Sequence, residues 1–307
     1  MAKKVVVLQG GFSAEREVSL SSGGMIAQAL QKKGYEVILH DLRDVRAFLR
    51  LLEAEKPDAV FNGLYGNWGE DGEIQAVLDM LQIPYTHSGV RASLLGMDKN
   101  LTRMIAEANG IKVAPAEKMT FGHLKNSGVK MPTPYVVKPV ADGSSVGVFI
   151  IHNGEELKQI KYDCDDREIL VEKFIPGREL TCAVLNGKAL AVTELRPKAG
   201  FYDYQAKYTG GMTEHILPAD LPQAVAEAVK RYAETIHKAL GCNMLSRSDF
   251  RYNEDDGVVF LEINTNPGMT PLSLVPEQAK YCGISYEELC SRLVEAAQCR
   301  KLRITGN

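Results

Sequence analysis

The chain has 307 residues, with 36 Lys and Arg against 39 Asp and Glu, and its formal net charge is −3. Because the acidic and basic residues are interspersed, this balance argues against a nucleic-acid partner or an anionic membrane surface. No apolar run approaches the ~20 residues that span a bilayer. The six cysteines are scattered without a CxxC pair. That usage is typical of reduced thiols, so we expect a cytoplasmic protein, long enough for two or three domains.

The N-terminal part of the chain is predicted to alternate strands and helices. Residues 5–9 are a continuous apolar run ending at Gly10 and Gly11, and an amphipathic helix follows, closed by Gly34. Further strands are predicted at 35–39 and 59–61, with a helix at 45–55 between them. This order indicates a parallel sheet with helices on both faces. Ligands bind beyond the carboxyl ends of such strands, where Glu15 could hold a substrate ammonium group.

The middle of the chain changes style after a predicted helix at 92–109, which carries Lys99 and stops at Gly110. A strand at 135–138 leads through Pro139 into the loop ADGSSVG, residues 141–147. Backbone N–H groups of a loop rich in Gly and Ser can cradle phosphate oxygens, and Lys138 could neutralise them. The pattern is neither Walker A nor GxGxxG, so an ordinary turn remains the alternative.

The second half of the chain is predicted to be rich in antiparallel strands. A strand is expected at 168–174, and the clearest hairpin joins 180–185 to 188–195 through Asn186-Gly187. Residues 196–213 form a long polar and aromatic segment, which we expect to order over a ligand as a lid. Helices follow at 221–240 and at 286–298, the latter begun by a capping box from Ser285 to Glu288.

A second hairpin carries the residues around which the rest of the chain is organised. Apolar runs at 246–252 and 258–263 flank a polar stretch ending in Gly257. A turn centred between residues 255 and 256 would set Asp249 directly opposite Glu262, with Asn264 on the same face. Facing carboxylates repel unless a cation lies between them, and oxygen-only ligands suit Mg²⁺ or Mn²⁺. Arg247 on the same face points to phosphate chemistry, and a solvated hairpin is the alternative.

Eight stretches, in order along the chain, resemble the D-alanine–D-alanine ligases of the ATP-grasp superfamily. They are GGFSAEREVSL, GEDG, MDK, VKP with DGSSVG, EKFIPGREL, FYDYQAKY, SRSDF and EINTNPGMTPLSLVP. The resemblance implies an α/β and α+β chain with three-domain ATP-grasp architecture. Residues 1–90 would form a parallel, Rossmann-like α/β domain, 91–178 a small central ATP-binding domain, and 179–307 an antiparallel-sheet domain with the metal site. A homodimer is also implied.

The resemblance assigns roles to residues at the matching positions. Those implied to contact ATP are Lys99, Lys138, Ser145, Glu172, Lys173, Phe174, Ile175, Glu179, Phe201, Lys207 and Leu261. Asp249, Glu262 and Asn264 match the ligands of two Mg²⁺ or Mn²⁺ ions. Residues implied to contact the amino-acid substrates, or to act in catalysis, are Glu15, Val18, Ser144, Tyr208, Arg247, Gly268, Ser273 and Leu274.

The implied reaction joins two D-alanine molecules at the expense of ATP, through a D-alanyl phosphate, for peptidoglycan precursor synthesis. Glu15 would hold the first ammonium group, Arg247 and the Gly268 N–H would stabilise the oxyanion, and Ser273 and Leu274 would receive the second carboxylate at a helix N-terminus. The hydrogen-bonded pair Ser144–Tyr208 is the candidate for removing the amine proton.

The sequence departs from the family pattern at Tyr65 and Leu272, where we expect His, and both are interpreted as modifiers of affinity.

Three alternative functions are kept. A non-catalytic relative would be expected to lose a metal ligand or Arg247. A D-alanyl-D-lactate ligase would be expected to carry His in place of Tyr208. Another ATP-grasp ligase would not be expected to share GGFSAEREVSL or FYDYQAKY.

Overall fold

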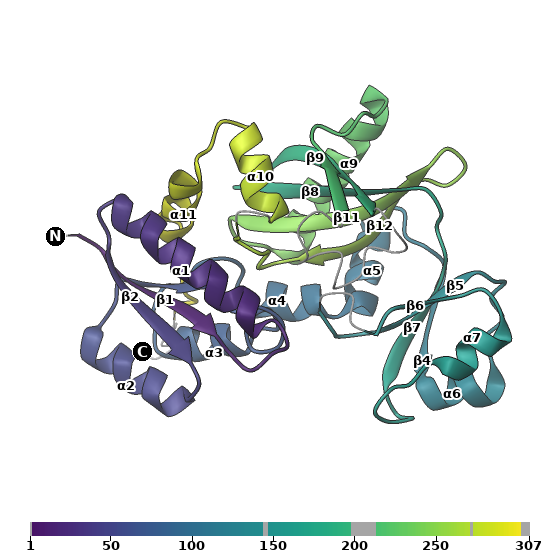
Figure 1. Cartoon of the computed structure of the whole chain (residues 1–307), viewed down its shortest axis with the longest axis horizontal. Helices are drawn as coiled ribbons and strands as arrows, with labels where there is room; N and C mark the ends of the chain where they lie inside the picture. The colour runs from purple at the N-terminus through teal and green to yellow at the C-terminus, as the bar shows by residue number, and fades with distance from the viewer. Residues whose placement is uncertain (1, 144–146, 198–212, 271–272, 302–307) are drawn as a thin grey trace, which may run out of the picture.

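The structure is a computed structural model, and it describes residues 2–143, 147–197, 213–270 and 273–301. Three sheets make up its framework, each with its own helices (Figure 1). The N-terminal sheet and the sheet of residues 116–173 lie at opposite ends of the molecule, and the sheet of residues 178–264 lies between and above them in this view. The mixed α/β and antiparallel architecture confirms the predicted fold class.

The N-terminal sheet is parallel, with the strand order β2-β1-β3. Its elements are β1 (Lys4–Gly10), α1 (Arg16–Lys32), β2 (Glu36–Leu42), α2 (Val45–Glu55), β3 (Ala59–Asn62) and α3 (Glu73–Met80). Alternate residues of a strand face opposite sides. Accordingly Val5 and Val7 pack with α1, whereas Val6 and Leu8 pack with α2 and α3. The predicted strands, their parallel pairing and the helices on both faces are confirmed; α3 was not predicted.

Residues near the C-terminus complete this N-terminal part. The last helix, α11 (Tyr286–Glu295), packs on α1 and β3. Beyond it, Gln298 exchanges both backbone hydrogen bonds with Tyr85, each 3.1 Å long. Tyr85 in turn bridges in parallel to Val60 of β3. The N-terminal sheet is therefore extended by residues from the other end of the chain.

The sheet of residues 116–173 is antiparallel, in the order β4-β7-β5-β6. It comprises β4 (Ala116–Thr120), α6 (Phe121–Ser127), β5 (Tyr135–Pro139), β6 (Phe149–Ile151), α7 (Gly154–Gln159) and β7 (Glu168–Lys173). Phe121 and Leu124 of α6 pack on Val137 and Val171 and close a small core of their own. The phosphate-loop candidate therefore leaves β5 from a separately packed sheet.

The five-stranded sheet has the order β10-β9-β8-β11-β12 and is antiparallel throughout. Its elements are β8 (Arg178–Leu185), β9 (Lys188–Pro197), β10 (Thr213–Ile216), α9 (Gln223–Leu240), β11 (Leu245–Asn253), β12 (Gly257–Asn264) and α10 (Leu274–Tyr281). Helix α9 covers one face through Val229 and Ile236, and α10 packs near Ala183 on the other. The Asn186-Gly187 hairpin is confirmed, with positive φ at both residues.

Two predicted helices differ from those in the structure. The helix expected over 92–109 is two helices, α4 (Val90–Met97) and α5 (Lys99–Ala108). Asp98 between them has an extended backbone, and its carboxylate accepts the Leu101 N–H at 2.8 Å, which starts a new helix. The last helix ends at Glu295 rather than 298, because Gln298 is engaged in the bridge to Tyr85.

The hairpin of β11 and β12 contains a β-bulge that the sequence did not reveal. Asp249 pairs with Glu262, as predicted, but Phe250 pairs with Phe260 and Asn253 with Gly257. The turn is therefore centred on residue 255, half a residue before the predicted centre. The register of the two strands shifts between Asp249 and Phe250. The extra residue in the bulge restores the pairing of the two acids. The predicted pairing is confirmed, and the predicted turn centre is wrong.

Candidate active site

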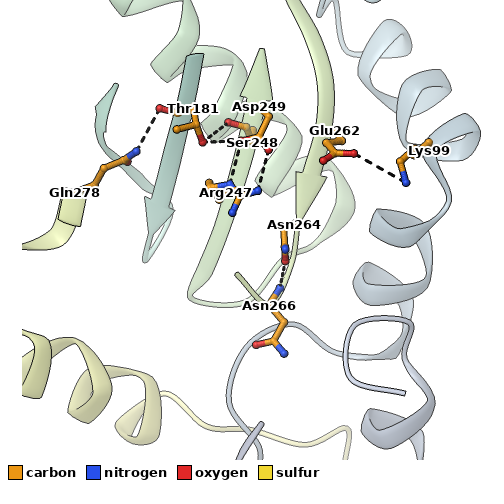
Figure 2. Close-up of polar contacts among 9 residues, drawn as sticks. All are labelled: Lys99, Thr181, Arg247, Ser248, Asp249, Glu262, Asn264, Asn266 and Gln278. Atoms are coloured by element: carbon orange, nitrogen blue, oxygen red, sulfur yellow. Dashed lines mark hydrogen bonds and ion pairs between the residues drawn. The ribbon is translucent and has the colours of Figure 1, made fainter. Parts of the chain in front are cut away.

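The metal-ligand candidates lie on neighbouring strands of the five-stranded sheet. Asp249 on β11 is directly opposite Glu262 on β12, and Asn264 is opposite Arg247. Figure 2 shows these side chains together on one side of the hairpin, with Lys99 approaching from α5. Asn264 Oδ1 accepts the Asn266 N–H at 2.8 Å, which fixes the orientation of its amide. The sequence therefore brings oxygen ligands and cations to one place, as predicted.

Asp249 is held on both sides by neighbouring groups. Arg247 donates to it in a fork, from Nε to Oδ1 at 3.0 Å and from Nη2 to Oδ2 at 2.8 Å. Thr181, its register partner on β8, donates to Oδ1 at 2.6 Å. Paired, planar donors of this kind fix a carboxylate more firmly than a lysine does. Asp249 is therefore preoriented, and Arg247 lies against the same carboxylate.

Lys99 links the acid pair to the phosphate-loop candidate. Its ammonium group lies 4.0 Å from Glu262 Oε2 and donates to the carbonyl oxygen of Asp142. The side chain is only 9% exposed. Arg167 pairs with the Asp142 carboxylate and ties the start of this loop to its own sheet. A cation therefore lies between the loop and Glu262, where a phosphate chain would need one.

The residues assigned to the nucleotide occupy adjoining strands. Lys138 on β5 pairs with Glu172 on β7 at 2.6 Å, and both side chains are nearly buried. Such a pair is costly to desolvate without further partners. It lies on adjacent strands of one sheet, and its two members are the residues assigned to opposite ends of the nucleotide. Two other assigned side chains form ion pairs: the Lys173 ammonium group lies 3.1 Å from a carboxylate oxygen of Asp256, and a carboxylate oxygen of Glu179 lies 3.1 Å from the Arg251 guanidinium. Of the assigned apolar side chains, Ile175 is buried, and Phe174 and Leu261 are half-buried.

Glu15 lies where the N-terminal sheet meets the phosphate-loop candidate. It is 7% exposed and directly precedes α1, with the half-buried Val18 in the first turn of that helix. A Cβ added at Gly66 would lie 3.1 Å from Glu15 Oε2, and one added at Gly143 would lie 3.3 Å from it. Glycine at both positions leaves this carboxylate the room it needs. Glu15 is thereby brought beside the start of the loop.

Gly268 and Ser273 lie together after β12. A Cβ added at Gly268 would lie only 3.0 Å from Ser273 Oγ. Ser273 is the N-cap of α10, as predicted, and Leu274 is the first residue of that helix. Ser273 Oγ accepts the Thr270 N–H at 3.0 Å. The predicted oxyanion donor and carboxylate receiver are therefore neighbours at a helix N-terminus.

Two residues near this site escaped the sequence reasoning. Thr181 was missed because only the register of β8 against β11 brings it to Asp249. Glu70 is the other: its carboxyl lies near Glu15, Arg247 and Asn264. Desolvation and the Glu15 charge raise the pKa of Glu70, and Arg247 and Asn264 act in the opposite direction. The GEDG stretch is part of the family resemblance, but the resemblance assigns no role to its glutamate, Glu70.

Several assigned residues lie outside the described part of the chain. These are Ser144, Ser145, Phe201, Lys207 and Tyr208, together with the departure at Leu272 and most of the expected lid. Among the residues that the structure does describe, no helix is long and apolar enough to cross a bilayer.

Comparisons with known proteins agree with this arrangement. The family model described as "D-ala D-ala ligase C-terminus" matches residues 105–295. A D-alanine–D-alanine ligase from Gluconobacter oxydans is 50% identical over 97% of this chain and 100% of its own length. One from Sphingopyxis alaskensis is 51% identical over 95% of this chain and 97% of its own.

Solved structures extend the likeness to the fold. A D-alanine–D-alanine ligase from Bacillus anthracis complexed with ATP superposes with a TM-score of 0.80 at 34% identity, covering 96% of this chain and 97% of that one. The VanG D-Ala:D-Ser ligase from Enterococcus faecalis gives 0.81 at 28% identity, covering 96% and 99%. The fold is that of the ATP-grasp ligases, and the chain is an ATP-dependent enzyme of this class. Within the class, the chain belongs to the D-alanine–D-alanine ligase family.

Proposed function

We propose that this chain joins two molecules of D-alanine to D-alanyl-D-alanine, with ATP converted to ADP and phosphate, for peptidoglycan precursor synthesis. The observation that carries the proposal is the pairing of Asp249 with Glu262 beside Lys99, since acids and cations gathered in this way suit phosphate transfer. The proposal includes a cytoplasmic homodimer, as the family resemblance implies. It also keeps the division into domains at residues 1–90, 91–178 and 179–307.

ATP would lie between the sheet of residues 116–173 and the five-stranded sheet. Glu172, Lys173 and the backbone of Ile175 would hold the adenine, with Phe174 and Leu261 as apolar walls, and Glu179 would hold the ribose. Lys99 and Lys138 would face the phosphates. The pairing of Lys138 with Glu172 across adjacent strands supports this placement, because it joins the adenine end to the phosphate end.

Asp249, Glu262 and Asn264 would hold two Mg²⁺ or Mn²⁺ ions. The donors fit such ions, because two carboxylates and an amide oxygen on paired strands offer oxygen ligands only. When bound, the ions would neutralise the phosphate oxygens during transfer. Arg247 and Thr181 orient the Asp249 carboxylate, and the Asn266 N–H orients the Asn264 amide, so the protein itself fixes two of the three proposed ligands.

The reaction would proceed in two stages. Glu15 would hold the ammonium group of the first D-alanine, whose carboxylate oxygen attacks the γ-phosphorus and displaces ADP, giving an acyl phosphate. The amine of the second D-alanine, its proton removed through the Ser144–Tyr208 pair, then attacks the acyl carbon. The peptide bond forms, and phosphate leaves with the former carboxylate oxygen and takes up the proton. Arg247 and the Gly268 N–H would stabilise the intervening oxyanion. Ser273 and Leu274 would receive the second carboxylate at the start of α10.

The first test is the choice of substrate. A coupled assay of ADP release should show turnover with D-alanine alone and none with L-alanine. Assays with D-alanine plus D-lactate, and with D-alanine plus D-serine, test whether the enzyme instead joins D-alanine to one of these second substrates. D-serine is included because the superposed Enterococcus faecalis structure is named as a D-Ala:D-Ser ligase. Faster ADP release with either mixture than with D-alanine alone, with the mixed product identified, would reject the proposed specificity.

A substitution at Gly268 tests the second subsite. Gly268→Ala is expected to fold, because the added Cβ meets a hydroxyl rather than backbone, 3.0 Å away. Displacing Ser273 Oγ costs about one hydrogen bond, ~1 kcal/mol, so the Michaelis constant for the second D-alanine should rise roughly fivefold. Gly24→Ala is the matched control, since a Cβ there meets nothing within 4 Å. If the Michaelis constant for the second D-alanine does not change, Ser273 does not bind the carboxylate of that substrate.

A further inference from the structure

Tyr65, one of the two residues at which the sequence departs from the family pattern, contacts the loop that carries Gly268. Its hydroxyl oxygen accepts the backbone N–H of Met269 at 3.0 Å. From the opposite side, the hydroxyl of Tyr286 donates to the Met269 carbonyl oxygen at 2.7 Å. Tyr65 is 4% and Met269 1% exposed, so water does not compete for these bonds. Two tyrosines from opposite ends of the chain therefore hold both backbone polar groups of one residue.

The same loop is tied on the other side of Gly268. The side-chain amide of Asn266 donates to the carbonyl oxygen of Leu64 at 2.7 Å, and Asn266 is fully buried. Leu64 directly precedes Tyr65, so both ties come from one short segment of the N-terminal part. Gly268, which has no side chain to anchor it, lies between the two fixed points.

We propose that Tyr65, acting with Tyr286, is a positioning residue that sets the direction of the Gly268 N–H toward the reacting carbonyl. This inference rests on the proposed function, in which that N–H stabilises the oxyanion. Fixing Met269 at both its N–H and its C=O restricts rotation of the 268–269 and 269–270 peptide planes. On the other side, the Asn266 tie and the fixed φ of Pro267 hold the chain, so the 267–268 plane that carries the Gly268 N–H lies between two restrained segments. A donor misplaced by about 1 Å can cost up to two orders of magnitude in rate. Tyr65 thereby supports the second stage of the reaction without touching a substrate.

The chemistry of a phenol suits this role. Burial raises the pKa of Tyr65, so its hydroxyl remains protonated at neutral pH and adds no charge near Glu15. The ring also fills space in the interior. Phenylalanine keeps that packing and removes the hydroxyl alone, which makes Tyr65→Phe a narrow probe.

The test separates the two stages by counting ADP released per dipeptide formed. In the wild-type enzyme with D-alanine this ratio should be 1. Tyr65→Phe should lower the rate of dipeptide formation roughly tenfold and raise the ratio of ADP to dipeptide above 1. The acyl phosphate should form normally, but part of it should be hydrolysed before the amine attacks. The Michaelis constant for ATP should not change. Hydrogen exchange at the Met269 amide should become faster in the variant.

Tyr286→Phe removes the opposite tie and should raise the same ratio, so it decides the question if Tyr65→Phe does not fold. Tyr85→Phe is the matched control: its hydroxyl donates to Asp79 at 3.0 Å, away from the Gly268 loop, and the ratio should stay at 1. A ratio of 1 in both Tyr65→Phe and Tyr286→Phe would overturn the positioning role. A wild-type enzyme that makes no dipeptide would instead reject the proposed function.

Discussion

Replacing Glu262 with glutamine is expected to abolish ligation and to leave the fold intact. Glu262 would contribute the charge shared by both metal ions, and metal ions contribute several kcal/mol to charge stabilisation, so turnover should fall roughly 10³-fold or more. The fold should tolerate the change, because the side chain is 31% exposed and its contact with Lys99 is a long one of 4.0 Å. Steady-state ADP release and thermal unfolding would be measured together.

The control for this substitution is Glu254→Gln, in the exposed turn of the same hairpin. It changes the same chemical group and should leave turnover unaltered. Asp249→Asn is expected to be milder for metal binding, and added Mg²⁺ should restore part of its activity. Near-normal turnover of Glu262→Gln would mean that the hairpin does not hold the metals.

The second large effect is expected at Glu15. Glu15→Gln removes the charge that would pair with the first ammonium group, in a site where the carboxylate is nearly buried. Loss of such a partner costs at least about 2 kcal/mol, so the Michaelis constant for the tighter D-alanine site should rise roughly 30-fold or more. The constant for the weaker site should change little. Initial rates fitted to separate constants for the two sites provide the measurement.

Ser273→Ala is the counterpart to Glu15→Gln and should act on the weaker site only. Its effect should be smaller, because backbone N–H groups at the start of α10 still face the carboxylate. If Glu15→Gln altered the weaker constant and spared the tighter one, the two subsites would be exchanged.

Local patterns in the sequence predict most of the strands and helices of the fold. The strands of the N-terminal sheet, the Asn186-Gly187 hairpin and the Ser285 cap all depend on residues close together in the chain. The pairing of Asp249 with Glu262 was predicted from a turn whose centre was wrong by half a residue. It holds because a bulge at Asp249 compensates, and nothing in the local pattern marks a bulge in advance.

The contacts that could not be predicted join segments far apart in the chain. Thr181 reaches Asp249 through strand order, and Lys138 meets Glu172 through the register of β5 against β7. From the sequence, Tyr65 is only a departure from a family pattern, interpreted as a modifier of affinity. Its bond to Met269 depends on how two sheets pack, which periodicity and residue type do not encode.

The bridge between Tyr85 and Gln298 has a consequence for how the protein is made. Residues 1–86 are synthesised well before residues 286–298, so the N-terminal sheet and α1 gain α11 and Gln298 only later. At about 5–20 residues per second, the two events are separated by roughly 10–40 s. During that interval the apolar surface that Leu289 and Leu293 later cover is open to water. The N-terminal sheet is thus made early and covered late, and a chaperone that shields its open face would act on residues 1–86 during that interval.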